Sequence, residues 1–421
     1  MHTPTRRVFM GAGLVGGAAL VAGCSDDSPS SEPGVSASAA PDQRTWDPQD
    51  WDSVRAQFQL DPELAQFAAF VLSPHTKLLD AVIADHRERL GRDTEDALLT
   101  GRASEQAVRD AAAAFAGGDP SQYALTDSTT MGIATMYGGL TLRADDEVLT
   151  TTHDFFSTED ALRLMELRTG AKVTRVDLYD DPAAATVDDM TKRLLDAVTP
   201  RTRVVALTWV HSSTGVRVPV QEIAAGLRDD VMLCVDGVHG FAAVDVDLPD
   251  LGCDFLATGT HKWLFGPRGT GILWAGDWEP LTELIPSFSG PDGPARLTAG
   301  GYKAFEHQWA VKDAFEFQQS IGRARVVERT VEQAAQLKDG LNGIDGLTLV
   351  TPADPAVSAG IVCVDVAGLP PANAVQELRT RGVVASATPY QRSYLRLGPS
   401  IATSPEQVDQ AIAALQEIVQ A

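Results

Sequence analysis

Apolar and polar residues alternate in blocks from about residue 104 to residue 280, and the blocks predict strands and helices in turn. Compact apolar runs that predict strands occupy 147–152, 172–178, 203–210, 231–235, 255–258 and 270–275. Segments with apolar residues at helical spacing lie before and between them, at 105–116, 158–168, 186–197 and 220–228. Short apolar strands separated by helices are typical of a mostly parallel sheet with helices on both faces. The pattern therefore predicts an α/β fold.

The segments next to this region add helices. Apolar residues around Leu64, Phe67, Phe70 and Leu78 have helical spacing, which predicts a helical region over 61–92. Two helix starts carry pairs that are typical of capped N-termini. These pairs are Ser157 with Asp160 and Thr186 with Asp189.

Beyond Pro280 the composition changes, and a second, smaller α+β domain is predicted. The segment 286–294 is rich in Gly, Ser and Pro, and a long helical stretch follows over 308–341. Strands near residue 348 and over 361–366, with helices over 372–381 and 405–420, complete the pattern. We expect five sections in all: a signal peptide at 1–24, a disordered linker at 25–50, a segment at 51–74 that joins the small domain, a large domain at 75–289 and a small C-terminal domain at 290–421.

The N-terminus has the features of an export signal. Arg6 and Arg7 precede a Gly/Ala-rich apolar stretch of roughly 14 residues, which is too short to cross a bilayer as a helix. Twin arginines before such a stretch resemble a Tat signal, and the ending Val-Ala-Gly-Cys at Cys24 resembles a bacterial lipobox. The segment predicts export by the Tat machinery and a lipid anchor at Cys24 on the outer face of the cytoplasmic membrane. A cytosolic protein with a chance cysteine is the alternative.

Charge and cysteine content narrow the classes of partner. The net charge of −23 disfavours nucleic acid and anionic lipid, so we expect contact with a membrane only through the anchor. Cys234, Cys253 and Cys363 lie in apolar runs, which indicates buried thiols and not a disulfide framework.

A carboxylate and a lysine follow two of the predicted strands. Asp236 comes directly after the run 231–235, and Lys262 lies in the turn Thr-Gly-Thr-His-Lys-Trp at 258–263. Pyridoxal phosphate chemistry requires both groups, because the lysine forms a Schiff base and the carboxylate keeps the pyridine nitrogen protonated. A solvated surface lysine is the alternative, but its position between strands and its neighbours His261 and Trp263 are unusual for one.

Three further polar segments follow strands of the same sheet, at the end where ligands bind in such sheets. The segment 126–133, with Thr129 and Thr130, offers hydroxyl and N–H groups for a phosphate, although an ordinary helix cap would look similar. Phe155 in 152–157 can stack on a flat ring or belong to the core, and Ser212 in 209–215 can face a ligand or lie in a plain loop.

Other chemistries find less support. Asp236 with His239 could begin a metal site, but no second cluster supplies further ligands, so no metal is expected. A hydrolase would require a nucleophile elbow, and the sequence Gly-x-Ser-x-Gly is absent.

Together these motifs resemble the class V aminotransferase family of fold-type I pyridoxal phosphate enzymes. The resemblance covers about 65–410 and is strongest at 235–239 (Val-Asp-Gly-Val-His) and 259–271 (Gly-Thr-His-Lys-Trp-Leu-Phe-Gly-Pro-Arg-Gly-Thr-Gly). Members of the family include cysteine desulfurases, kynureninases and isopenicillin N epimerase-like proteins. The resemblance implies a large domain with a mostly parallel sheet and helices on both faces, plus a smaller α+β C-terminal domain.

The resemblance also implies roles for single residues around the cofactor. Lys262 corresponds to the Schiff-base lysine, Asp236 to the partner of the pyridine nitrogen, and His239 to a residue near the ring hydroxyl. The implied phosphate contacts are Thr129, Thr130 and Thr260. Phe155 falls where desulfurases place a stacking histidine, and a shift of the alignment would put Phe156 there instead.

Substrate and subunit contacts follow in the same way. Arg396 corresponds to the arginine that holds the substrate carboxylate, a task that suits a bidentate guanidinium, and Ser212 to a polar substrate-binding side chain. The segment 299–302, with Gly301, resembles the part that reaches the partner subunit's phosphate, which implies a homodimer with shared active sites.

Desulfurases of this family carry a persulfide cysteine in a loop before the C-terminal arginine, and 384–391 contains no cysteine. We therefore expect an exported pyridoxal phosphate enzyme that acts on an amino acid through Lys262. An aminotransferase-like or epimerase-like outcome is favoured, because the Thr-His-Lys-Trp string resembles that branch. A C–S or C–C lyase of the cysteine-lyase or kynureninase type is an alternative. A non-catalytic exported binding protein on the same fold is another.

Overall fold

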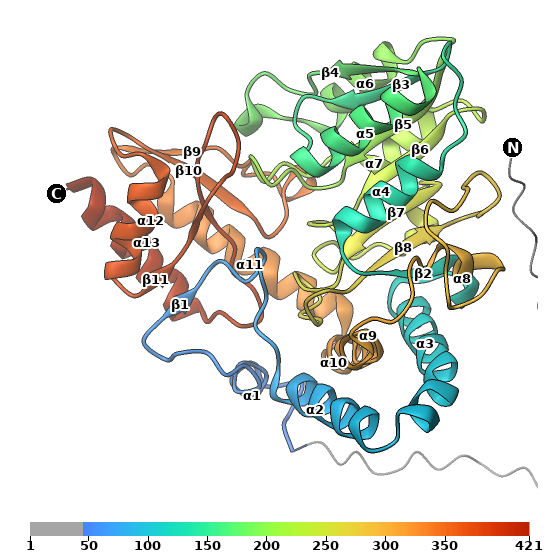
Figure 1. Ribbon diagram of the computed structural model, residues 1–421. Helices are drawn as coiled ribbons and strands as arrows, with labels where there is room; N and C mark the ends of the chain where they lie inside the picture. Colours follow the sequence, from blue (N-terminus) through green and yellow to red (C-terminus); the bar gives the residue numbers. More distant parts are fainter. Residues whose placement is uncertain (1–44, 421) are drawn as a thin grey trace, which may run out of the picture. The chain divides into compact units, whose positions relative to one another are not determined.

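The computed structural model describes residues 45–420, so the predicted signal, Cys24 and the linker up to residue 44 lie outside the described residues. The helices are α1 (Trp51–Arg55), α2 (Lys77–Arg92), α3 (Thr94–Ala116), α4 (Thr129–Gly139), α5 (Phe156–Thr169), α6 (Val187–Ala197), α7 (Val220–Gly226), α8 (Gly293–Leu297), α9 (Phe305–Trp309), α10 (Val311–Ile321), α11 (Arg323–Leu341), α12 (Pro371–Thr380) and α13 (Pro405–Gln420) (Figure 1). The strands are β1 (Ala65–Gln66), β2 (Tyr123–Thr126), β3 (Glu147–Thr151), β4 (Lys172–Val176), β5 (Thr202–Thr208), β6 (Met232–Asp236), β7 (Phe255–Gly259), β8 (Gly271–Ala275), β9 (Leu347–Leu349), β10 (Val362–Val366), β11 (Val383–Val384), β12 (Ser386–Ala387) and β13 (Leu395–Leu397). Within 45–420, no helix combines the length and the apolar character needed to cross a membrane.

A seven-stranded sheet forms the larger part of the fold, in the order β2-β8-β7-β6-β5-β3-β4. Only β8 runs antiparallel to its neighbours β2 and β7. The pairs from β7 to β4 are all parallel. This arrangement confirms the predicted α/β class with a mostly parallel sheet.

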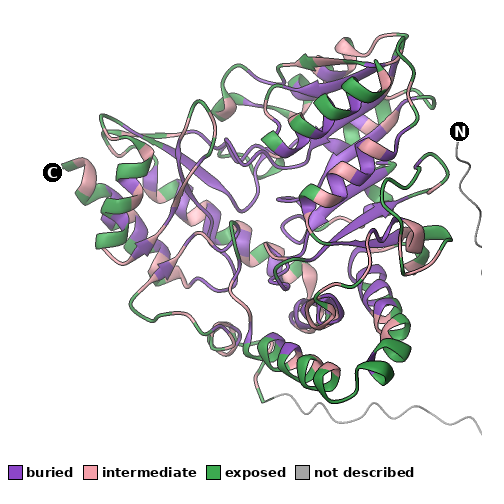
Figure 2. Cartoon of the chain, viewed as in Figure 1, coloured by how far each residue is buried: buried purple, intermediate pink, exposed green. Residues whose placement is uncertain are grey.

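Apolar side chains cover both faces of this sheet. Alternate residues of β5 point to opposite sides: Val204 and Ala206 pack with helices α4 and α5, whereas Val205 and Leu207 pack with α3, α6 and α7. Figure 2 shows the central strands as buried along their length, as expected for a parallel sheet between two helical layers.

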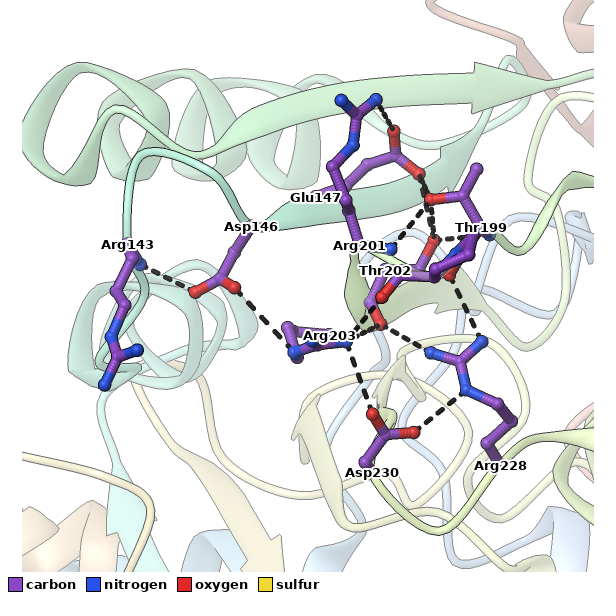
Figure 3. Close-up of polar contacts among 10 residues, drawn as sticks. Arg143, Asp146, Glu147, Thr199, Arg201, Thr202, Arg203, Arg228 and Asp230 are labelled. Carbon is purple, nitrogen blue, oxygen red and sulfur yellow. Dashed lines mark hydrogen bonds and ion pairs between the residues drawn. The ribbon is translucent and has the colours of Figure 1, made fainter.

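A closed polar network occupies the amino end of strands β3 and β5 (Figure 3). The buried carboxylate of Glu147 accepts hydrogen bonds from the hydroxyls of Thr199 (3.0 Å) and Thr202 (2.9 Å). Arg203 lies 3.7 Å from Asp146 and 3.3 Å from Asp230. Since these groups are paired with one another, this edge offers little to a ligand, and the opposite edge is the place to look for a site.

The C-terminal part forms a separate antiparallel sheet in the order β12-β13-β10-β9. Its apolar face packs against α11, α12 and α13 in a cluster of its own. Residues from the start of the described chain join this part, because β1 pairs in parallel with β11.

Three local predictions are wrong. The helix predicted over 61–92 begins only at Lys77, because Phe67 and Phe70 are buried in two different cores. The long helix over 308–341 is three helices, and α10 and α11 are separated by Gly322, whose φ of 101° is not helical.

The third error concerns a cap. Helix α5 begins at Phe156 after Phe155, and no side chain caps it, so the predicted start with Ser157 and Asp160 is wrong. The predicted cap at Thr186 is confirmed, because its hydroxyl accepts a hydrogen bond from the Asp189 N–H at 3.2 Å.

The turn after β5 depends on a glycine. Gly215 has φ 75°, and a Cβ atom there would lie 2.5 Å from the Ile361 carbonyl oxygen. We expect Gly215→Ala to lower the free energy of unfolding by about 2 kcal/mol or more, because left-handed backbone and a backbone clash both penalise alanine.

Urea unfolding measures this change, and Gly343→Ala is the matched control. Gly343 has φ 81°, but a Cβ atom there would meet nothing within 4 Å, so its replacement carries the backbone penalty alone. Equal losses in the two variants would contradict the steric explanation.

Candidate active site

A cavity of about 270 Å³ lies at the carboxyl ends of the parallel strands. Side chains from both sheets line it, and most of them follow directly after a strand. The lining residues are Val71, Ser128, Thr129, Thr130, Phe155, Ser157, Thr208, Ser212, Asp236, Val238, His239, His261, Lys262, Pro389 and Arg396.

Asp236 is the last residue of β6 and is 1% exposed. Its Oδ1 accepts the Val238 N–H at 3.0 Å, and its Oδ2 accepts the Thr158 hydroxyl at 3.3 Å. Burial raises the pKa of Asp236 to about 6, and Lys262 lowers it in part. Near neutral pH the carboxylate is mostly ionised and has few hydrogen-bond donors, so it can accept a further one from a ligand.

Lys262 lies in the turn between β7 and β8 and faces the same cavity. Its amine has no hydrogen bond or ion pair with the described residues. Removal from water, and next the charge of Arg396, lower its pKa to about 8, against a smaller opposite effect of Asp236. A large fraction of this amine is therefore unprotonated and nucleophilic at mildly alkaline pH.

The turn that carries Lys262 is fixed on both sides. The His261 carbonyl accepts the backbone N–H and the hydroxyl of Ser73 at 3.0 and 2.9 Å. The Trp263 carbonyl accepts the Gln318 side-chain amide, and the Trp263 ring stacks on Phe70 at 5.8 Å. The lysine thus stands on a rigid support, as a positioned catalytic group requires.

The start of helix α4 forms one end of the cavity, where an anion can bind. Ser128 caps the helix through the Met131 N–H at 3.1 Å. The hydroxyl of Thr129 is buried without a partner, and Thr129 and Thr130 both line the cavity. The turn of β7 comes close, since a Cβ on Gly259 would lie 2.8 Å from the Thr129 hydroxyl. Free hydroxyl and N–H groups at a helix N-terminus suit a phosphate.

Two rings, those of Phe155 and His239, border the cavity. Phe155 lines the cavity, whereas Phe156 is 63% exposed, so the structure places Phe155 and not its neighbour there. His239 is buried, and its Nδ1 has no partner. Burial, and then Lys262 and Arg396, hold the pKa of His239 well below its usual value, so the imidazole is neutral.

The smaller sheet contributes Arg396 from β13. Arg396 is 6% exposed, and its guanidinium donates to the Ser212 carbonyl and the Ser386 hydroxyl, each at 3.1 Å. The described residues offer Arg396 no carboxylate partner. A buried cation without an anion is costly, so this position suits an anionic ligand group.

Two residues with predicted cofactor contacts lie elsewhere in this chain. The Thr260 hydroxyl bonds to that of Thr270 and does not line the cavity. Gly301 lies beside a different groove, next to Phe288. The other predicted residues (Thr129, Thr130, Phe155, Ser212, Asp236, His239, Lys262 and Arg396) are brought together.

The structure adds a second carboxylate that the sequence analysis missed. Asp154, buried behind the cavity, accepts hydrogen bonds from Thr150, Thr151 and Thr208. Burial raises the pKa of Asp154, and its charge also raises that of Asp236. The signal that could have identified it is the one that identified Asp236: a carboxylate soon after an apolar strand.

Tyr390 was missed for another reason. Its hydroxyl lies 2.7 Å from the Ser212 hydroxyl, and its ring meets Phe155 edge-on at 6.0 Å. No local pattern in 384–391 indicates that this tyrosine reaches the large sheet.

The cavity fits pyridoxal phosphate. The unpartnered Thr129 hydroxyl suits its phosphate, the Asp236 carboxylate its pyridine nitrogen, and the free Nδ1 of His239 its ring hydroxyl. Lys262 offers an amine for its aldehyde. All of these groups line one cavity, and Phe155 supplies a flat wall for the ring.

Comparison with known sequences supports this assignment. The family model described as aminotransferase class-V matches residues 94–389. The isopenicillin N epimerase of Streptomyces clavuligerus is 27% identical over 400 residues, which cover 88% of this chain and 98% of that protein. A probable cysteine desulfurase of Xylella fastidiosa is 28% identical over 266 residues, or 58% of this chain and 61% of that protein.

Solved structures agree on the fold. A C-DES mutant with glycine covalently linked to its PLP cofactor has a TM-score of 0.80 at 21% identity, and the match covers 86% of this chain and 99% of that one. The cysteine desulfurase CsdA of Escherichia coli has a TM-score of 0.76 at 20% identity, covering 88% and 98%.

Proposed function

The chain belongs to the class V aminotransferase family, and from this premise we propose that it uses pyridoxal phosphate to move the α-proton of an amino acid. One observation carries the proposal: an unpartnered lysine amine, a buried carboxylate and a buried guanidinium without an anion surround one cavity. Epimerisation or transamination is the outcome we favour. The similarity to isopenicillin N epimerases over most of their length supports the first of these.

When bound, pyridoxal phosphate supplies an aldehyde that amines attack and a ring that withdraws electrons from the substrate's α-carbon. Lys262 would hold the cofactor through its side-chain amine. In its free form the same amine would take the substrate's α-proton and return it.

The other residues set charge and orientation. Asp236, whose carboxylate is ionised above its pKa of about 6, would accept a hydrogen bond from the pyridine nitrogen and favour the protonated form of the ring. Arg396 binds the substrate carboxylate with its free Nη2 group, and Ser212 keeps the guanidinium in place through its carbonyl. A fixed carboxylate and a fixed ring restrict which bond of the α-carbon is broken.

The reaction outcome is tested with an amino-acid panel in deuterated water. α-Deuteration without keto acid supports epimerisation, and keto acid with loss of the visible absorbance band supports transamination. A protein that stays colourless after addition of the cofactor contradicts the proposal and favours a binding protein on the same fold.

A C–S lyase is the second candidate, because several relatives are probable cysteine desulfurases. β-Elimination from a sulfur-bearing amino acid in the same panel would yield pyruvate, ammonia and the released thiol or sulfide. A persulfide relay is disfavoured, since 384–391 has no cysteine and Cys234, Cys253 and Cys363 are at most 7% exposed. Burial raises the pKa of each of these three thiols.

The pKa of Lys262 predicts a pH dependence for cofactor capture. A lysine with a lowered pKa becomes nucleophilic at lower pH than usual, so the rate at which the cofactor-free protein captures pyridoxal phosphate should rise with a midpoint near pH 8. Stopped-flow absorbance between about pH 6 and pH 10 measures this rate. A midpoint near 10.5, the ordinary value for lysine, would show that the site does not activate the amine.

We also propose a homodimer. Phe288 (68% exposed) and Tyr302 (77%) lie beside Gly301, and Leu284 and Ile285 are exposed nearby in sequence. Apolar side chains of this size on one segment favour burial against a second subunit. Sedimentation equilibrium tests the proposal, and a monomer at micromolar concentration would contradict it.

Export through the Tat route and lipidation at Cys24 are proposed from the N-terminal sequence alone. The variant Arg6→Lys/Arg7→Lys should remain in the cytoplasm, and Cys24→Ala should be released from the membrane fraction. Unchanged fractionation of either variant would contradict the corresponding proposal.

A further inference from the structure

A second cavity, of about 290 Å³, lies behind one wall of the candidate active site. Consecutive residues face the two cavities: Ser212 and Pro389 line the first, and Ser213 and Tyr390 line the second. The wall between them is closed by the hydrogen bond between the Ser212 and Tyr390 hydroxyls, 2.7 Å long.

The first cavity is small for a site that binds both a cofactor and a substrate. Its 270 Å³ must hold the cofactor as well as the substrate, and this is below the usual range of roughly 300–1,000 Å³ for ligand pockets. A long substrate side chain can therefore extend beyond it, and the wall at Tyr390 is one direction open to it. The wall at Tyr390 can open by loss of a single side-chain hydrogen bond and rotation of one ring.

The second cavity contains polar atoms that lack partners. The Ser213 hydroxyl and the Nε2 of His153 are buried without a hydrogen bond, and Ser213 is only 9% exposed. Buried polar atoms are nearly always bonded, so these two atoms are available to a ligand group that reaches them.

The back of this cavity is rigid. The His153 ring stacks on Tyr179 at 4.0 Å and 13°. The Tyr179 hydroxyl bonds to the Nδ1 of His211 (2.9 Å) and to the Thr214 hydroxyl (2.8 Å). Since these contacts hold the stacked rings, the space exists before any ligand arrives.

Arg392, an exposed arginine, is the one Lys or Arg side chain among the residues that line this cavity. Its guanidinium lies 5.2 Å from the Tyr394 ring centre, and it forms no ion pair within the described part of the chain. Two carboxylates lie nearby and both have partners: Asp180 pairs with Arg193 at 2.7 Å, and Asp177 accepts the Thr152 hydroxyl. An anionic group that enters the cavity thus finds one available cation and two available hydrogen-bond partners.

We propose that the second cavity binds the distal carboxylate of a long, acidic α-amino acid. The α-carboxylate lies on Arg396 and the side chain passes Tyr390. The distal carboxylate binds Arg392, with hydrogen bonds from the Ser213 hydroxyl and the His153 ring. This inference rests on the proposed function, whose substrate class it names.

The test compares side chains of equal length with and without a terminal carboxylate. Holoenzyme is titrated, by the change in its visible absorbance, with α-amino ω-carboxylic acids from aspartate upward and with linear alkyl amino acids. We expect the longer acids to bind about tenfold more tightly than their alkyl counterparts, which is the size of one hydrogen bond to a charged group. In Arg392→Gln this ratio should fall to about one.

Arg163→Gln is the matched control, because Arg163 is an exposed arginine paired with Asp160 on α5. In Arg163→Gln, the ratio of affinities between acidic and alkyl amino acids should equal that of the unchanged protein. A ratio near one in the unchanged protein, or a ratio that persists in Arg392→Gln, overturns the proposal.

A second measurement separates this proposal from the proposed function. Linear dicarboxylates should raise the thermal midpoint of the cofactor-free protein, monocarboxylates should not, and Arg392→Gln should remove the effect. Stabilisation by dicarboxylates without any spectral change by amino acids would contradict the proposed function and leave the second cavity as a carboxylate site. Spectral changes without a preference for acidic side chains, and without stabilisation by dicarboxylates, would overturn the second site alone.

Discussion

Replacing Lys262 with alanine should leave a folded protein that forms no covalent bond to pyridoxal phosphate. Lys262 is the one lysine among the residues that line the cavity, and its pKa is lowered to about 8, so its loss removes the amine that can act there as nucleophile and base. We expect α-proton exchange to fall by roughly 10⁴-fold, the upper end of the contribution of a positioned acid–base group. The measurements are the visible absorbance band, the mass after borohydride reduction, and deuterium incorporation.

Lys312→Ala is the control for this experiment. Lys312 is a partly exposed lysine paired with Glu316 on helix α10, and its loss should change none of the three readouts. A borohydride-stable adduct in Lys262→Ala, or exchange at the unchanged rate, would show that a different residue carries the chemistry.

The second large effect is expected for Asp236→Asn. Asparagine keeps the shape and can accept the Val238 N–H through its amide oxygen, while its NH2 group donates to the Thr158 hydroxyl, but it cannot supply the negative charge opposite a protonated pyridine nitrogen. We expect proton exchange to fall about 10²–10³-fold, as when one preorganised electrostatic contact is removed. Lys262 remains, so the covalent absorbance band should persist.

Asp236→Asn should keep the visible absorbance band and lose exchange rate, whereas Lys262→Ala should lose both, so the two measurements distinguish the variants. Asp160→Asn, which changes an exposed carboxylate on α5, serves as the control and should retain both. Loss of the band in Asp236→Asn would assign Asp236 to cofactor capture and not to charge stabilisation. An unchanged exchange rate would show that its charge is not used.

Much of the site could be predicted because strand ends are visible in a sequence. Asp236, Thr129 and Phe155 each come shortly after an apolar run, and parallel strands bring such residues to one edge. Arg396 could be found only by resemblance, since it comes from a different sheet. Its approach to Ser212 is a tertiary contact with no local signature.

The errors have the same origin. Leu64, Phe67 and Phe70 have helical spacing, but Phe67 and Phe70 are apolar because each packs against a different neighbour. Phe67 packs in the core of the small sheet, and Phe70 stacks on Trp263 below the lysine turn. Periodicity records that a side chain is buried and does not record against which partner it packs.

Asp154 and Tyr390 show a further limit. The three threonines that surround Asp154 come from two different strands. Tyr390 reaches Ser212 across 178 positions of the chain. The significance of such residues depends on what lies opposite them, and only the folded arrangement contains that information.

Because Cys234, Cys253 and Cys363 are buried, the described part of the chain presents no exposed thiol. Their raised pKa values keep them as thiols, so reagents that require a thiolate should react with them slowly. A protein that begins after Cys24 is therefore ready for site-specific labelling without removal of any native cysteine. A fluorophore on Gln391→Cys, beside Tyr390, would report in real time whether this loop moves when a ligand arrives.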